Sequence, residues 1–154
     1  MRKHLLTTLV FGLVAASRAV PARADVGLGV FLGEPTGLDL KAGLSHRSAL
    51  DLVLGFTRLS SNANGYGHVT YLVTPFIGQG DAVTIPLRLG IGGAVFGTRN
   101  DLELAVRVPF EIGVRLRRSP LEFYGEIALE FVFVDPANEL ELDVQGGGGF
   151  RVYF

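Results

Sequence analysis

The stretch DLELAVRVPFEIGVRLRRSP (residues 101–120) places an apolar side chain at every second position. Eight apolar residues alternate without a break: Leu102, Leu104, Val106, Val108, Phe110, Ile112, Val114 and Leu116. A helix repeats every 3.6 residues and cannot gather such a series on one face, whereas a strand turns successive side chains to opposite faces. The stretch therefore predicts one long β-strand.

The same alternation occurs in seven other stretches, which are residues 26–33, 37–45, 49–57, 67–76, 83–97, 121–133 and 141–154. Clusters of Gly, Asn, Asp, Ser and Pro separate them, as turns require. No connection is long enough for a crossover helix, so neighbouring strands should pair antiparallel. An even number of strands with short connections favours closure, because closure removes exposed edges. The sequence predicts an all-β, eight-stranded, up-and-down antiparallel barrel.

The first 24 residues have the pattern of an export signal. A basic start, MRKH, precedes a 12-residue apolar run at positions 5–16, and Ala22 and Ala24 form an A-x-A cleavage pattern. Twelve apolar residues are too few for a membrane-spanning helix, which needs about 20. We therefore expect a cleaved signal peptide at 1–24 and a single barrel domain at 25–154.

Composition excludes several classes of protein. Without the signal, ten basic residues face fifteen acidic ones, a net charge of −5 that argues against a nucleic-acid partner. The chain has no cysteine, so it has no disulfide and no thiolate metal site. Hydrophobic residues make up 48% of the chain, yet no run of 18 apolar residues follows the signal. The apolar residues are dispersed along strands instead.

The alternation fits two opposite barrels, a soluble lipocalin-like barrel with an apolar interior and a membrane barrel with a polar interior. Three features favour the membrane barrel. The polar face is rich in glycine, which suits a narrow interior filled by side chains. Its charges are nearly balanced and its cations are mostly Arg, the better partner for desolvated carboxylates. The opposite face is almost purely Leu, Val, Ile and Phe, as lipid contact requires.

The charged residues of the polar face should form a salt-bridge network that fills the lumen. They are Asp39, Lys41, Asp51, Arg88, Glu103, Arg107, Glu111, Arg115, Glu122, Glu126, Glu130, Asp143 and Arg151. The alternative interpretation is a polar path for a small solute or ion, which would make the protein a narrow channel. An eight-stranded barrel leaves just enough room for its own side chains, which favours the filled lumen.

The chain ends in GGGGFRVYF (residues 146–154), which resembles the last strand of bacterial outer-membrane barrels. In those proteins the assembly machinery reads a terminal aromatic with apolar residues at alternate preceding positions, a pattern matched by Phe150, Val152 and Phe154. Gly147 and Gly149 would leave clearance for lumen side chains. The stretch GVFLGEPTGLDLKAGLSHRSALDLVLGF (residues 29–56) also resembles the opening of a group of uncharacterised outer-membrane barrel proteins.

Over residues 25–154 the chain is similar to small eight-stranded outer-membrane barrels of the OmpA/OmpX size class. The resemblance implies a location in the outer membrane of a Gram-negative bacterium, with membrane lipid and the barrel assembly machinery as partners. Both ends of the barrel domain would be periplasmic. Since Trp is absent, aromatic girdles would come from other residues. The expected girdles are Phe56, Tyr66, Phe96 and Phe133 at one rim, and Phe76, Phe110 and Phe154 at the other.

Other motifs carry weaker functional hypotheses. A His–Ser pair would suit a lipid-modifying enzyme, but His46 and His68 have no orienting acid at motif spacing, and we expect a solvated turn histidine and a rim histidine. The loop at 58–67 could contact a surface ligand, although its small polar residues suit a plain loop. No metal-ligand cluster or cofactor motif is visible in the sequence.

The sequence thus predicts a non-enzymatic outer-membrane barrel with a structural or membrane-integrity role, without cofactor or metal. The alternatives are a soluble periplasmic barrel that binds a small apolar ligand, a narrow channel and a lipid-modifying enzyme.

Overall fold

The computed structural model describes residues 25–57, 64–98, 101–134 and 139–154. The expected signal peptide, its cleavage residues Ala22 and Ala24, and positions 58–63 of the expected outer loop lie outside the described residues.

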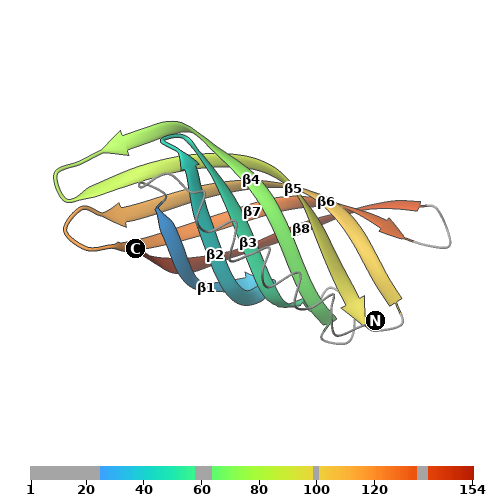
Figure 1. The fold of residues 1–154 in the computed structure, drawn as a ribbon. Helices are drawn as coiled ribbons and strands as arrows, with labels where there is room; N and C mark the ends of the chain where they lie inside the picture. The colour runs from blue at the N-terminus through green and yellow to red at the C-terminus, as the bar shows by residue number, and fades with distance from the viewer. Residues whose placement is uncertain (1–24, 58–63, 99–100, 135–138) are drawn as a thin grey trace.

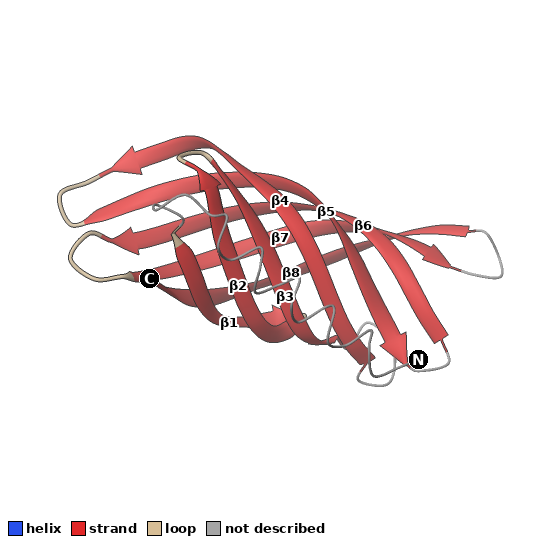
Figure 2. Cartoon of the chain, viewed as in Figure 1, coloured by secondary structure: helices blue, strands red, loops and turns tan. Residues whose placement is uncertain are grey.

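Eight antiparallel strands close into one barrel in which each strand pairs with its sequence neighbours and β8 pairs with β1 (Figure 1). The strands are β1 (Val26–Glu34), β2 (Thr36–Ser45), β3 (Ser48–Thr57), β4 (Asn64–Gln79), β5 (Val83–Thr98), β6 (Asp101–Leu116), β7 (Leu121–Val134) and β8 (Glu139–Tyr153). The described residues outside the strands form turns and short connections (Figure 2). The predicted all-β, eight-stranded antiparallel barrel is confirmed.

The described part of the chain holds no helix of the length and apolarity that crossing a membrane demands.

The barrel has two distinct ends. At the turn end, three short turns at 46–47, 80–82 and 117–120 join β2 to β3, β4 to β5 and β6 to β7. We call the opposite end of the barrel, where β1 is joined to β2, the loop end. Strands β1 to β3 have 9 or 10 residues and β4 to β8 have 14 to 16. The β4–β5 and β6–β7 hairpins therefore project beyond β1–β3 at the turn end, on the left of Figure 1.

Strand β4 differs from its prediction in two respects. It begins at Asn64, so positions 64–67 of the expected outer loop are paired strand opposite β3. It also contains a register shift between Val73 and Phe76. Pro75 lies within this shift, and proline has no N–H to donate to the ladder, so the chain bulges there.

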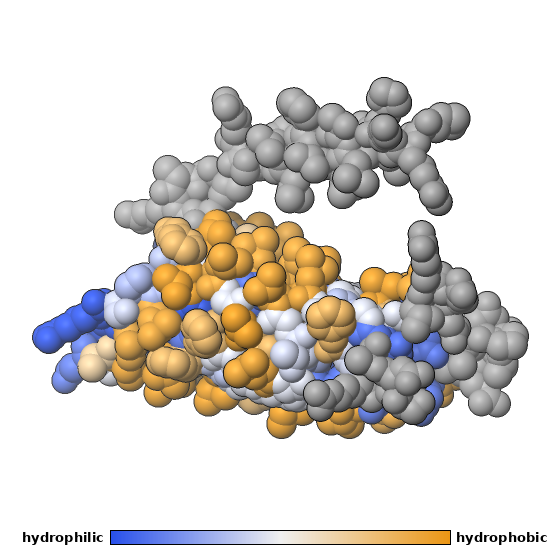
Figure 3. Space-filling view, turned by 90° about the horizontal axis from the view of Figure 1, so that it is seen from below, coloured by the Kyte–Doolittle hydropathy of each residue, from blue (hydrophilic) through white to orange (hydrophobic). Residues whose placement is uncertain are grey.

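The two faces of the sheet have opposite chemistry. Of the described residues, 33 large hydrophobic side chains are exposed, and most lie on the outer face, among them Leu104, Ile127 and Leu129. In the space-filling view these gather into an orange band, with blue hydrophilic residues toward the ends (Figure 3). Ten charged side chains in the middle of the barrel point inward and are buried.

The prediction of an outer aromatic girdle was wrong for two residues, Tyr66 and Phe96. Tyr66 and Phe96 point into the barrel, where each is about 5% exposed and their rings stack with centroids 6.0 Å apart. They share the inward phase of their strands with His68 and Ala94, and strand alternation decides the direction of a side chain whatever its type. The remaining girdle candidates point outward: Phe56, Phe133, Phe76, Phe110 and Phe154.

The glycines of β8 allow close approach at the seam with β1. A Cβ at Gly149 would lie 2.5 Å from the carbonyl oxygen of Val30 and 2.7 Å from the Tyr124 ring. A Cβ at Gly147 would lie 2.5 Å from the carbonyl oxygen of Leu32 and 2.8 Å from Cζ of Phe31. These two positions thus leave room for two inward rings and for the β1 backbone, in line with the clearance expected from sequence.

Candidate functional site: the charged interior of the barrel

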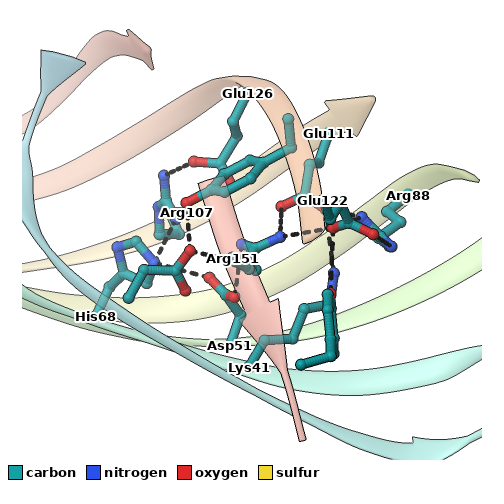
Figure 4. Close-up of polar contacts among 12 residues, drawn as sticks. Lys41, Asp51, His68, Arg88, Arg107, Glu111, Glu122, Glu126 and Arg151 are labelled. Carbon is teal, nitrogen blue, oxygen red and sulfur yellow. Dashed lines mark hydrogen bonds and ion pairs between the residues drawn. The ribbon is translucent and has the colours of Figure 1, made fainter. Parts of the chain in front are cut away.

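Arg151 is the centre of the interior network. Its guanidinium lies on β8 and is fully buried. It contacts Asp39 Oδ2 through Nε at 2.6 Å, Asp51 Oδ1 through Nη2 at 2.9 Å and Glu111 Oε2 through Nη1 at 2.8 Å. One side chain therefore links β8 to β2, β3 and β6 across the lumen (Figure 4).

Aromatic rings support this guanidinium from one side. The Tyr124 ring lies 3.6 Å beneath the guanidinium carbon of Arg151, and the Tyr124 hydroxyl donates to Asp39. Phe31 stacks with Tyr124, with ring centroids 5.9 Å apart. A planar guanidinium favours such a stacked position, which also restricts its rotation.

A second group of ion pairs adjoins the Arg151 group toward the turn end. Arg88 donates to both carboxylate oxygens of Glu122, at 2.9 and 2.8 Å, and also contacts Glu111. Lys41 Nζ lies 3.1 Å from Glu111 Oε1. The hydroxyl of Tyr153 lies 3.2 Å from Glu122. Glu111 is therefore shared by three cations and joins the two groups.

The third group lies toward the loop end. Arg107 contacts Glu126 at 2.7 Å, Glu130 at 3.3 Å and His68 Nε2 at 2.9 Å. The Tyr66 hydroxyl donates to Glu130 at 2.5 Å. It also lies 3.1 Å from Gln145 Oε1, so the group crosses from β4 to β7 and β8.

The three groups fill the middle of the barrel. Six of these side chains are 0% exposed, so bulk water does not reach them: Arg107, Arg151, Glu111, Glu122, Glu130 and Asp39. Within the described chain, four buried Lys and Arg side chains face six buried carboxylates. Charge-assisted hydrogen bonds between oppositely charged groups offset the desolvation of these ions. The arrangement is a packed polar plug.

Ten of the thirteen expected lumen residues belong to this plug. They are Asp39, Lys41, Asp51, Arg88, Arg107, Glu111, Glu122, Glu126, Glu130 and Arg151.

The other three lie apart from the plug or at its edge. Arg115 is at the turn end, where it pairs with Asp25 at 3.0 Å and covers the Tyr153 ring at 4.0 Å. Glu103 lies toward the loop end opposite Phe96 and is half-buried. Asp143 is half-buried opposite Glu130, and its Oδ2 has no hydrogen-bond partner in the described structure.

The expected assembly signal lies on the outer face. Phe150 and Phe154 are exposed and Val152 is half-buried, so all three point away from the plug. The loop expected at 58–67 cannot be assessed as a surface site, since 58–63 lie outside the described residues and 64–67 belong to β4.

The two histidines have different surroundings. His46 is exposed in the β2–β3 turn, as expected. The expectation of a rim position for His68 was wrong, because its ring is buried between Arg107, Tyr66 and Asp51, whose Oδ2 is 3.5 Å from His68 Nε2. Its inward phase in β4, shared with Thr70 and Leu72, was the signal that could have placed it.

Sequence reasoning also missed the uncharged members of the plug. Tyr66, Tyr124, Tyr153 and Gln145 supply hydroxyl or amide groups to the carboxylates or to one another. Their inward phase was readable, but their partners lie on strands that are not neighbours in sequence.

Among the described residues, no group of three or more His, Cys, Asp or Glu side chains is arranged to hold a metal ion. No protein-family model, no curated protein and no solved structure matches the chain. The inference of function therefore depends on the barrel's two faces and its plug.

Proposed function

We propose that this protein is an outer-membrane β-barrel with a structural role in the membrane and a lumen closed to solutes. The observation that carries the proposal is the inversion of the two faces, with large apolar side chains outside and charged side chains sealed inside. In water the apolar side chains of this band would stay exposed at a cost in free energy, whereas in a membrane lipid tails would cover them.

The backbone also supports a membrane position. The barrel is closed, so every strand is paired with two neighbours through the middle of the barrel, where lipid could not satisfy unpaired backbone groups. Strands of about 9–11 residues suffice to cross a bilayer when tilted, and the shortest strand here has 9. We infer that the turn end faces the periplasm and that the barrel assembly machinery inserts the chain.

The plug supports a non-conducting role. Arg151 and its carboxylate partners are buried, and they extend across the lumen from β2 and β3 to β6 and β8. The same plug weighs against a soluble barrel that binds a small apolar ligand, because charged side chains occupy the interior where such a ligand would bind. A non-enzymatic role remains part of the proposal.

Refolding with and without lipid tests the proposal. We expect denatured protein to regain β-structure, followed by circular dichroism, only when phospholipid vesicles or detergent are present. The refolded protein should float with the vesicles and resist extraction by alkaline carbonate. Folding to a monodisperse soluble barrel in plain buffer would instead support the periplasmic binder.

A further inference from the structure

The turn end contains two adjoining pockets next to the plug. The larger, of about 530 Å³, is lined by residues that include Arg115, Arg117, Arg118 and Ser119. The smaller, of about 90 Å³, is lined by residues that include Lys41, His46, Arg88 and Asp25. Arg115 lines both pockets, so they lie side by side, and we call the two together the vestibule.

The vestibule has a strong excess of basic side chains. Five Lys and Arg side chains line it together with His46, whereas Asp25 is the one acidic residue in the lining of the two pockets. Asp25 is already paired with Arg115 at 3.0 Å. Asp81, in the β4–β5 turn, lines neither pocket. At the plug side, Glu111 and Glu122 satisfy Lys41 and Arg88, so the uncompensated charge lies in the outer part of the vestibule.

Two of the arginines have no acidic partner in the described part of the chain. Arg117 and Arg118 are both exposed in the β6–β7 turn, and no ion pair includes them. The side chain of Arg117 is held by Gln79, whose Oε1 accepts a hydrogen bond from Nη2 at 3.3 Å. Its backbone N–H donates to Ala82 at 2.9 Å. Arg117 is therefore oriented by neutral groups, and its charge is available to a ligand.

We propose that the vestibule binds a phosphate-bearing anion. Guanidinium groups match phosphate oxygens with paired N–H donors, and three arginines line the larger pocket together with the hydroxyl-bearing Ser119 and Thr84. The pocket is open to solvent, so a phosphate ester can bind with its phosphate against the arginines and its other end outside. The plug residues Lys41 and Arg88 line the smaller pocket and are paired with Glu111 and Glu122, so the ligand binds at the turn end and does not pass through the barrel.

The phosphate has two possible sources with the same chemistry. One is a soluble phosphate ester at the turn end, and the other is the headgroup of an anionic phospholipid at the edge of the apolar band. The binding site itself does not depend on the membrane location, because its residues are charged and accessible in either setting. A failure of membrane insertion would therefore leave phosphate binding measurable in detergent.

The test uses the barrel domain folded in a non-ionic maltoside detergent, which contains no phosphate. Inorganic phosphate is titrated at constant ionic strength against chloride, and binding is followed by ³¹P NMR line width. Arg117→Gln removes one vestibule charge, and Arg118→Gln is a second variant at the neighbouring position. Arg47→Gln is the matched control, since Arg47 is an exposed turn residue at the same end that lines neither pocket.

We expect saturable phosphate binding that weakens about tenfold in Arg117→Gln, the effect of one charge-assisted contact, and stays unchanged in Arg47→Gln. Absence of saturable binding, or equal weakening by all three variants, would overturn the proposal. Repeating the titration in bilayers with and without phosphatidylglycerol distinguishes the sources. If phosphatidylglycerol weakens phosphate binding, the natural ligand is a lipid headgroup. If it has no effect, the natural ligand is a soluble phosphate ester.

Discussion

Nη2 of Arg151 on β8 lies 2.9 Å from Oδ1 of Asp51 on β3, although 100 residues separate them in the chain. The two strands are not neighbours in the barrel, because β1 and β2 lie between them. The contact therefore crosses the interior and forms only when the barrel has closed. Arg151 thus connects the last strand to the first half of the chain by a side-chain ion pair, in addition to the backbone hydrogen bonds between neighbouring strands.

Replacement of Arg151 by methionine should strongly destabilise the barrel. The variant leaves Asp39, Asp51 and Glu111 without their shared cation, and removing one partner of a buried ion pair typically costs about 3–5 kcal/mol. Urea unfolding of the refolded barrel, followed by circular dichroism, measures the change in the free energy of unfolding.

Arg115→Met is the control for this experiment. Its partner Asp25 is 60% exposed, and an exposed ion pair contributes about 0–1 kcal/mol. Equal losses for the two variants would show that the central plug does not stabilise the fold more than the rim does.

Gly149→Ala should destabilise the seam between β8 and β1. The added Cβ would lie 2.5 Å from the Val30 carbonyl oxygen, which is backbone and cannot move aside alone. Overpacking of this kind costs about 1–3 kcal/mol. The matched control is Gly125→Ala on the neighbouring strand, where the new Cβ finds only the Gly147 carbonyl oxygen at 3.8 Å. The same urea titration should show a lower free energy of unfolding for Gly149→Ala and no change for Gly125→Ala.

An arginine on the middle of the apolar band should impair membrane insertion. Leu129 is exposed on the outer face opposite Val108, near the centre of β6 and β7. Arginine at the midplane of a lipid-facing strand costs about 2–4 kcal/mol. We therefore expect Leu129→Arg to reduce the fraction that folds into vesicles, measured by flotation.

Asp81→Arg provides the comparison, since it introduces the same side chain in an exposed turn away from the band. If both variants insert as efficiently as the parent protein, the outer face does not contact lipid.

The sealed lumen should not conduct ions. In planar bilayers we expect no stepwise current from the inserted protein, because Arg107, Arg151 and their partners leave no water-sized gap. An open porin inserted into the same bilayer verifies that channels are detected. Regular current steps from this protein would contradict a closed plug and favour the narrow channel.

The alternation of residue types predicted most of the fold, because period two assigns each strand residue to one face. It placed Arg107, Glu111 and Arg151 inward before any contact was known. It misjudged the start of β4, since the Gly- and Asn-rich stretch at 58–67 has the composition of a turn. Pairing with β3 and β5 keeps residues 64–67 in the sheet despite that composition.

The partners inside the plug could not be predicted from the sequence. Which side chains meet across a barrel depends on strand tilt and stagger, and local patterns contain neither. Thus His68 was readable as inward-facing, but its contacts with Arg107 on β6 and Asp51 on β3 required the closed structure. The vestibule depends in the same way on two hairpins that project together at the turn end.

The central claim is that this barrel has its apolar face in the outer membrane. The most direct test is the gel mobility of the protein from isolated outer membranes, compared with and without boiling in detergent. We expect the protein in that fraction, where it should migrate at a different apparent size until it is boiled. A protein found in the soluble periplasmic fraction, with the same mobility before and after boiling, would contradict it.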